Sequence, residues 1–443
     1  MKRLDQLQGY TGLAGFVKKE MNSMDPEKNR FGTARSEAAF KTSFLFLCFF
    51  VILLYDKPFH YLRSLVEYRL PLIAGIVAFV VMVMEARSRG LNFLKNLDGQ
   101  IALYLGFTAM AFLSVIFSYW PKQSFEASIG ITKILLLVLI MSIVLDSLKR
   151  IWGLIWLAIL TLLVPAIGGL HLFLTGGIPP ADDGVVRLAY IGQFANSNEL
   201  AFTLAIYLPL LVSYLFTKKR LLAKLAVFSF IVLFLIDILL TASRAAYIGV
   251  MVYVVYLVLT MKKRIIILFL LIPIVILATN FDFSDHIKRV TTTSKELDDS
   301  AQTRLSSWEA GIAMGLSRPF VGVGINCFNL AYLEYNKGRD YNVTTSHNTF
   351  ISVLAETGFL GALFFYLLVL KCFKDLIALK KNLKGSEERE EMLPLVTGLL
   401  GSMIIFVVCG FFNDYQFDSS TVLMMGLIAG LKNARSKVEV VFS

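Results

Sequence analysis

Long apolar runs recur along the whole chain, and they limit its possible folds more than any other feature. A helix needs about 20 apolar residues to cross the hydrocarbon core of a bilayer. By that measure the sequence predicts about twelve spans, of which the second and the last are short. They cover residues 39–55, 70–84, 100–118, 127–145, 151–174, 199–216, 221–241, 245–261, 264–280, 348–370, 393–412 and 419–432. The chain is 56% hydrophobic and 17% charged, too apolar for one soluble core. We therefore predict an all-α polytopic membrane protein.

The lysines and arginines between these runs predict which side of the membrane each connection faces. Basic residues concentrate on the cytoplasmic loops of membrane proteins. With both termini in the cytoplasm, the short basic stretches EARSRGLNFLK, DSLKR, TKKR, MKKR and KNARSK all fall on that side. The expected domains are a cytoplasmic tail or amphipathic helix over 1–38, a transmembrane domain over 39–432 with an extracytoplasmic loop over 281–347 and a cytoplasmic linker over 371–392, and a cytoplasmic tail over 433–443.

The positive charge of the chain needs no nucleic acid to explain it. The net charge of +11 comes largely from these loops, and no basic patch with interleaved aromatic residues stands apart from the spans. Cys48, Cys327, Cys372 and Cys409 lie far apart and show neither metal-ligand spacing nor a disulfide framework. We expect the lipid bilayer as the surroundings, no nucleic-acid partner, no metal and no cofactor.

Polar segments that interrupt the apolar pattern gather on the predicted outer face. They are FANSNE at 194–199, SR at 243–244, TRLSSW at 303–308, SHN at 346–348 and NDYQFD at 413–418. Ionisable residues at membrane depth are costly, and they usually serve a function. The sequence therefore predicts one site at the outer membrane boundary, built from five distant segments.

Two arginines are the candidate cations of that site. Arg244 begins a span seven residues after Asp237, so a continuous helix would place both on one face, about 10 Å apart, around a polar cavity. Arg304 and Trp308 lie one turn apart on a helix expected in the outer loop. The planar, permanently charged guanidinium suits phosphate oxygens. The alternatives are a snorkelling Arg244, a solvated Arg304 and a hydrogen-bonded Asp237 between helices.

His347 is the candidate acid–base group. It lies directly before a span whose helix Ser346 or Asn348 could cap. Histidine can remove a proton from a hydroxyl near neutral pH, although an interface histidine can also be merely hydrogen-bonded. Glu356 lies nine residues further on, below the interface. It is either a buried structural hydrogen-bonding group or part of a reaction chamber, and we favour the structural role.

The segment SHNTFISVLAETGFLG resembles the signature of the O-antigen ligase and polymerase family of bacterial membranes. That signature reads His-Asn, a Leu-rich stretch and then Glu-x-Gly-x-x-Gly. The matching residues here are His347, Asn348, Glu356, Gly358 and Gly361. We expect the two glycines to permit close helix packing.

Three further segments are similar to family motifs and follow in the same order. GQFANSNELA holds Asn196 and Asn198, and TASRAAYIG holds Ser243 and Arg244. The third, RLSSWEAGIAMGLSRPFVGVGINCF, holds Arg304, Trp308, Pro319, Gly322 and Gly324. The resemblance covers about residues 185–430, whereas the first 180 residues match only as generic spans.

The resemblance implies a fold of the GT-C type, in the bacterial cytoplasmic membrane, that moves a glycan from undecaprenyl diphosphate to an acceptor hydroxyl outside. His347 would be the general base, and Arg244 and Arg304 would hold the diphosphate without a metal. One-step displacement would invert the anomeric carbon. A retaining route would need a carboxylate nucleophile, for which Asp414 is the outer acid to consider.

The motifs leave the acceptor open. We favour ligase-type transfer to lipid A–core or a similar acceptor, with repeat-unit polymerisation by the same family as the alternative. A polyprenyl-glycan flippase or transporter is less favoured, because transporters tend to carry polar residues at the bilayer midplane and internal repeats. A non-catalytic assembly scaffold is the remaining alternative.

Overall fold

A computed structural model of the protein describes residues 40–55, 70–90, 98–180, 184–217, 219–260, 295–336, 344–383 and 389–442. Within these residues the chain is helical and contains no strand. The helices are α3 (Lys41–Tyr55), α4 (Leu70–Ser88), α5 (Gly99–Ile116), α6 (Pro121–Val144), α7 (Leu148–Leu174), η4 (Gly192–Ala195), α8 (Ser197–Tyr214), α9 (Leu221–Leu240), α10 (Arg244–Thr260), α13 (Lys295–Ser317), α14 (Phe328–Tyr335), α15 (Thr349–Asn382), α16 (Arg389–Gly410) and α17 (Ser419–Phe442).

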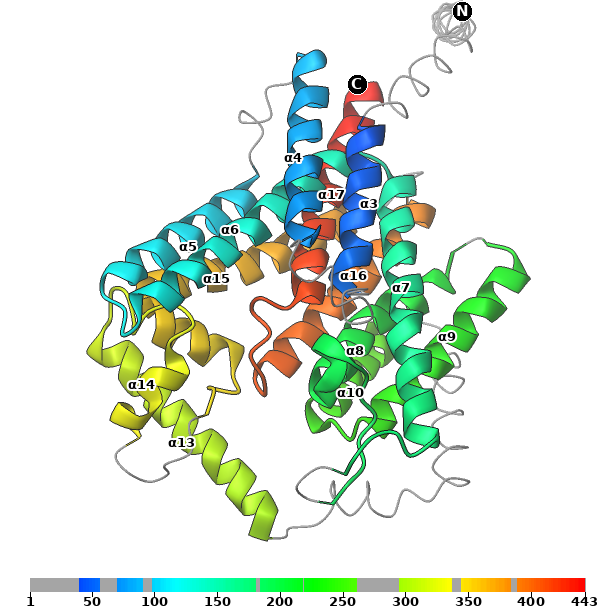
Figure 1. Ribbon diagram of the computed structural model, residues 1–443. Helices are drawn as coiled ribbons and strands as arrows, with labels where there is room; N and C mark the ends of the chain where they lie inside the picture. The colour runs from blue at the N-terminus through cyan, green and yellow to red at the C-terminus, as the bar shows by residue number, and fades with distance from the viewer. Residues whose placement is uncertain are drawn as a thin grey trace, which may run out of the picture.

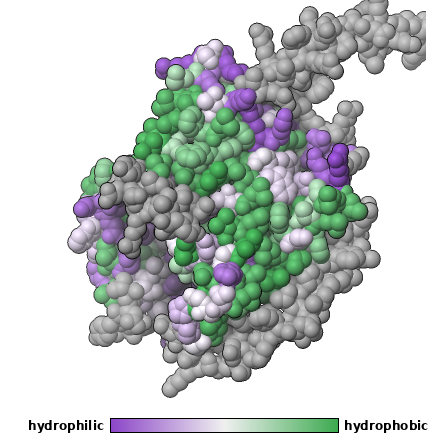
Figure 2. Space-filling view, turned by 45° about the vertical axis from the view of Figure 1, so that its right-hand side comes forward, coloured by the Kyte–Doolittle hydropathy of each residue, from purple (hydrophilic) through white to green (hydrophobic). Residues whose placement is uncertain are grey.

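The helices confirm the prediction of an all-helical polytopic membrane protein. Every predicted span coincides with a helix except 264–280, which lies outside the described residues, so the count of twelve stays a prediction. Among the described residues, seven helices are long and apolar enough to cross a membrane, and α3 and α10 are shorter apolar helices. Figure 2 shows broad hydrophobic areas on one face, with hydrophilic side chains at its upper end and along its left and right edges.

Two helices extend past the predicted spans. Helix α15 continues through residues 371–382 of the expected linker, as far as Asn382. Leu376 and Leu379 keep one face of this extension buried, and Lys380 and Lys381 favour its C-terminal end because cations stabilise the negative pole of a helix. Likewise α17 does not end at residue 432 but runs on to Phe442.

Helix α8 lies at the centre of the bundle. Nearly all of its side chains are buried, and it packs against α9 and α16. In Figure 1, α3, α4, α7 and α17 stand together, whereas α5, α6 and α15 lie side by side at an angle to them. The core therefore sits between an upright group of helices and an inclined one.

Helices α13 and α14, with the segment between them, form a small cap on the inclined helices. The helix predicted around residues 302–315 is present as part of α13. The cap is pinned to the turn after α5: the Tyr119 hydroxyl donates to a Glu334 carboxylate oxygen at 2.6 Å, and Arg318 donates to the Phe117 carbonyl at 2.6 Å. The Arg318 guanidinium also lies over the Tyr119 ring, 4.4 Å from its centroid. These contacts fix where α13 presents its side chains.

At the opposite end of the inclined helices, charged residues are paired. The Lys432 ammonium donates to Asp98 at 2.7 Å and to Asp375 at 2.7 Å, and Lys371 pairs with Asp375 as well. This cluster ties α17 to α15 and to the residue before α5. Each ionic group in it thus has an opposite charge in contact.

Candidate functional site

Two loops far apart in sequence are joined around Asp414. One carboxylate oxygen accepts a hydrogen bond from the Ser346 hydroxyl at 2.6 Å, and the other accepts from the His347 backbone N–H at 3.3 Å. Two residues after His347, the Thr349 hydroxyl donates to the Asn413 carbonyl at 2.8 Å. The segment before α15 is therefore fixed to the loop between α16 and α17.

Of the two predicted caps of α15, Ser346 and Asn348, the residue at the N-cap position is Asn348. Its side-chain oxygen accepts from the backbone N–H groups of Phe350 and Ile351 at 3.0 and 3.1 Å. Its amide nitrogen donates to the Phe411 carbonyl at 3.3 Å. Asn348 therefore caps the N-terminal end of α15 and also binds the loop that follows α16. Both contacts help to position the adjacent His347.

His347 is held in an unusual backbone conformation. Its φ of +49° lies in the left-handed region, which non-glycine residues rarely adopt and which clusters at functional sites. Its ring nitrogen Nε2 lies 3.3 Å from the Thr344 hydroxyl. Burial lowers the pKa of His347, the charge of Asp414 opposes that shift, and the nearby charge of Arg304 adds to it. The imidazole is therefore neutral, and able to accept a proton, at neutral pH.

The two predicted arginines lie within electrostatic reach of each other and of this histidine. Burial lowers the pKa of Arg304, the positive charge of Arg244 lowers it further, and Tyr415 acts in the opposite direction. Both guanidinium groups are half-buried, and neither makes a hydrogen bond or an ion pair to any residue that the structure describes. Two neighbouring cations without an acid between them favour a multivalent anion such as a diphosphate.

Tyr415 links the site to the start of α8. It was not among the predicted site residues. Its hydroxyl donates to the Asn198 carbonyl at 3.1 Å, and its ring stacks on Phe202 with centroids 3.8 Å apart. Asn196 caps α8, since its side chain accepts from the Asn198 N–H at 2.9 Å. Asn196 and Asn198 thus form the start of α8, next to Tyr415. The segment NDYQFD pointed to the right loop, but the stacking partner could not be predicted from it.

Glu356 is buried and hydrogen-bonded to the segment between α13 and α14. One of its carboxylate oxygens accepts from the Phe328 backbone N–H at 3.2 Å, and its carbonyl accepts from the Gly324 N–H at 3.1 Å. Gly322 lies against the same backbone with φ of +68°, and a Cβ there would clash with Glu356. The Pro-x-x-Gly-x-Gly block is therefore the partner of the Glu-x-Gly motif.

Gly358 acts differently from expectation. It was predicted to permit close packing between helices, but it breaks α15 with φ of +67° and ψ of −171°. The next N–H, of Phe359, donates to the Pro319 carbonyl at 2.6 Å, and a Cβ on Gly358 would lie 2.6 Å from that same oxygen. Gly361 lies against the Thr357 side chain and close to Met110 of α5. The break lets the first turns of α15 face the cap.

Asp237 is not brought to the arginines in the way proposed. Helix α9 ends at Leu240, and the chain turns through Ala242, with φ of +52°, before α10 begins at Arg244. The two side chains therefore share no continuous helical face. The Asp237 carboxylate is buried, and neither of its oxygens has a hydrogen-bond partner within the described chain.

Two donors beside the arginines are also unsatisfied. The Ser243 hydroxyl precedes Arg244, and the Trp308 indole N–H lies one turn after Arg304 on α13. Both atoms are buried, and neither finds a hydrogen-bond partner among the residues described. Buried polar groups are nearly always hydrogen-bonded, so these two call for an explanation. Because both donors lie next to an arginine in the sequence or on the same helix, a ligand bound by the arginines would explain them.

Residues 229–366 match the model of a family described as O-antigen ligase. The match includes α10, α13 and the start of α15, and so contains Arg244, Arg304 and His347. No curated protein matches the chain. Over residues 229–366 the chain is therefore similar to the O-antigen ligase family.

Proposed function

We propose that the protein is a glycosyltransferase that moves a glycan from undecaprenyl diphosphate to an acceptor hydroxyl on the outer face of the bacterial cytoplasmic membrane. We further propose that the acceptor is lipid A–core or a similar molecule, as in a ligase. The family match supports the class of activity. The observation that carries the mechanism is the meeting of one neutral imidazole with two guanidinium groups that have no acid partner in the described chain.

The proposed reaction is a single displacement. His347 removes the proton of the acceptor hydroxyl, and the acceptor oxygen attacks the anomeric carbon as the bond to the diphosphate oxygen breaks. The diphosphate leaves with the bonding electron pair, and its growing charge is stabilised by Arg244 and Arg304. Fixed cations in a partly dry site stabilise such charge strongly. Attack from the face opposite the leaving group inverts the anomeric carbon.

Asp414 acts in this scheme as a positioning residue. Both of its carboxylate oxygens accept hydrogen bonds, from Ser346 and from the backbone of His347. A nucleophile needs a free lone pair aimed at the anomeric carbon, whereas these oxygens are directed at the loop that carries the base. This arrangement supports the inverting route over a retaining one.

The reaction needs no metal in this proposal, because the two guanidinium groups supply the positive charge that the leaving diphosphate requires. Trp308, Ser243 and Asn198 complete the surroundings of the diphosphate and the acceptor. The orientation with both termini in the cytoplasm is also part of the proposal. It is supported by Lys380, Lys381 and Arg389, which lie at the end of the bundle opposite the site.

The proposal is tested by transfer in vitro. Purified protein in nanodiscs would be given a polyprenyl-diphosphate glycan and lipid A–core, with and without EDTA. We expect lipid A–core to receive glycan, in an inverted linkage and equally well with EDTA. If the donor glycans lengthen and lipid A–core receives none, the enzyme is a repeat-unit polymerase of the same family. No glycan transfer with any of these acceptors would contradict the proposal.

A further inference from the structure

Lys133 is a charged residue in a place where charge is costly. It lies on α6, twelve residues after Pro121 and eleven before Val144. At 1.5 Å per residue it is about 18 Å from one end of a candidate membrane span and about 17 Å from the other. Its side chain is exposed on the helix surface and makes no hydrogen bond or ion pair with the described residues. An ionisable residue inside a membrane span is usually functional.

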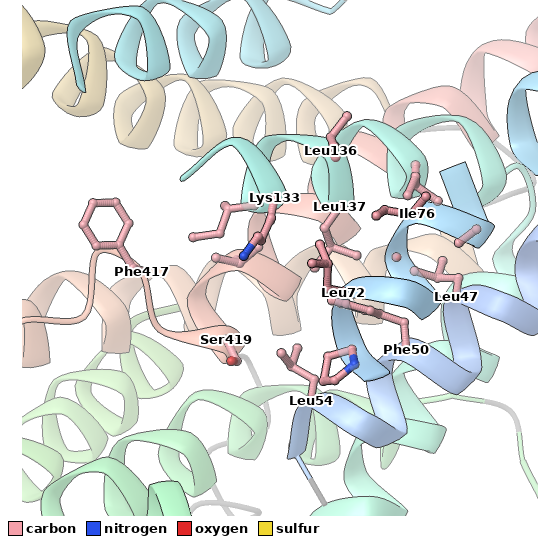
Figure 3. A pocket seen from close by; sticks show the side chains of 16 residues that line it. Leu47, Phe50, Leu54, Leu72, Ile76, Lys133, Leu136, Leu137, Phe417 and Ser419 are labelled. Atoms are coloured by element: carbon pink, nitrogen blue, oxygen red, sulfur yellow. The ribbon is translucent and has the colours of Figure 1, made fainter. Parts of the chain in front are cut away.

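The side chain of Lys133 lies at an apolar cavity. The cavity has a volume of about 450 Å³ and lies between α3, α4, α6 and α17. Its walls include Phe50, Leu72, Ile76 and Leu137, and Lys133 is the one charged residue among those that line it. Figure 3 shows Lys133 reaching in between these apolar residues on one side and Phe417 and Ser419 on the other. An apolar space with one cation in its wall fits the apolar chain of a lipid that has a negatively charged end.

The cavity shares a wall with the candidate site. Phe417 and Ser419 line it, and they follow Asp414 and Tyr415 in the same loop. Five residues span at most about 18 Å of chain, so the cavity begins close to the site. Phe417 also packs against Phe107 in the middle of α5, with ring centroids 6.1 Å apart. One face of this loop is therefore turned toward the lipid-like cavity, while Asp414 holds the segment that carries His347.

We propose that this cavity holds part of the isoprenoid chain of the polyprenyl diphosphate donor, and that the Lys133 ammonium attracts the diphosphate end of that lipid toward the 411–418 loop. The inference rests on the proposed function. Charge complementarity selects an anionic lipid, and continuity with the site loop selects the donor over a phospholipid of the bulk membrane. The arginines bind the diphosphate at the reacting end, and the cavity orients the chain behind it.

The test uses a probe that reports where the lipid binds. Full-length protein in phosphatidylcholine nanodiscs would be photolabelled with a farnesyl diphosphate that carries a photoreactive group at the far end of its chain. We expect labelled peptides from α4, α6 and α17 around Ile76, Leu137 and Val422. Loss of one charge-assisted contact lowers affinity about tenfold. Lys133→Met should therefore lower labelling at subsaturating probe about tenfold, and Lys133→Arg should restore most of it.

A matched pair of variants tests the cavity itself. Ile76 lines the cavity, whereas Ile73, on the same helix, does not, and the two are 51% and 49% exposed. Because both side chains already face outward, a tryptophan at either position disturbs the core little. Ile76→Trp fills the cavity and should lower labelling at least as strongly as Lys133→Met. Ile73→Trp should leave labelling unchanged.

The outcomes separate this inference from the proposed function. Undecaprenyl phosphate should compete with the probe, and phosphatidylglycerol at the same concentration should not. Equal competition by phosphatidylglycerol, or unchanged labelling in both Lys133→Met and Ile76→Trp, would overturn the inference even if glycan transfer is normal. Labelling that follows the expected pattern, without transfer to any acceptor, would support the lipid site and contradict the proposed function.

Discussion

The two ends of the inclined helices handle charge in opposite ways. At one end, Lys432 contacts both Asp98 and Asp375, so each charge is satisfied within the protein. At the other end, Arg244 and Arg304 lie near each other without an acid partner in the described residues. Paired charges hold helices together, whereas two neighbouring positive charges repel each other and lower the stability of the folded protein. This difference is the basis of our proposal that the first end serves the fold and that the second binds a ligand.

The largest effect is expected when the proposed general base, His347, is replaced. His347→Ala should lower the rate of glycan transfer by about 10²–10⁴-fold, because general-base catalysis contributes on that order. The matched control is His171→Ala, since His171 is an exposed histidine in the last turn of α7. Transfer rates of purified variants measure the effect. Equal rates for His347→Ala and His171→Ala would remove His347 from the reaction.

The next largest effect is expected at the arginines. Arg304→Gln and Arg244→Gln should each lower the transfer rate by about 10²–10³-fold, because each removes a cation aimed at the leaving charge. The control is Arg220→Gln, at an exposed position before α9. Arg304→Lys keeps the charge and loses the fork, so an intermediate rate is expected. If the glutamine variants match the control, the unpaired arginines are not the diphosphate site.

The pH dependence of the transfer rate also tests the role of His347, and the expected effect is smaller. A general base must be neutral, so the transfer rate should fall as pH drops through the pKa of His347, which burial places below its ordinary value. The charge of Asp414 raises that pKa, so Asp414→Asn should move the acid limb to lower pH. Arg304 lowers it, so Arg304→Gln should move the acid limb to higher pH. Pre-steady-state rates between about pH 4 and 8 would show the two shifts.

Asp414→Asn also removes one hydrogen bond to the loop of His347, and we expect a transfer rate at neutral pH about tenfold lower. Shifts of both variants in the same direction would mean that the observed pKa does not belong to His347.

The smallest effect is expected at the paired end. Lys432→Met leaves Asp98 and Asp375 without their shared cation, and about 1–2 kcal/mol of stability should be lost, because the pair is only partly buried. Thermal unfolding in detergent would measure this loss. Transfer per folded molecule should stay unchanged. A large loss of transfer in well-folded Lys432→Met protein would contradict the division between the two ends.

Much of this arrangement could be predicted from the sequence. Helix positions follow from apolar runs, because a membrane-spanning helix must satisfy its backbone internally and face lipid. The convergence of Arg244, Arg304 and His347 was inferred from the side of the membrane on which each polar segment falls. Charge alternation in the loops is enough for that, because it places distant segments on one face.

The parts that could not be predicted depend on the path of the chain in space. A glycine in Glu-x-Gly could equally serve close helix packing or a break, and only the approach of Pro319 shows that Gly358 breaks α15. The helical face that Asp237 and Arg244 were expected to share is interrupted by the turn at Ala242. Lys133 offered a signal, a lysine inside a predicted span, but its significance depends on the cavity that other helices form around it.

The most direct test of the account is a double-mutant cycle on diphosphate binding. Affinity for a non-reactive polyprenyl diphosphate would be measured for the wild type, Arg244→Gln, Arg304→Gln and the double variant. If both guanidinium groups hold one diphosphate, each single change weakens binding at least about tenfold and the two effects are not additive. Undiminished binding after either single change, or strictly additive losses, would contradict a shared diphosphate site.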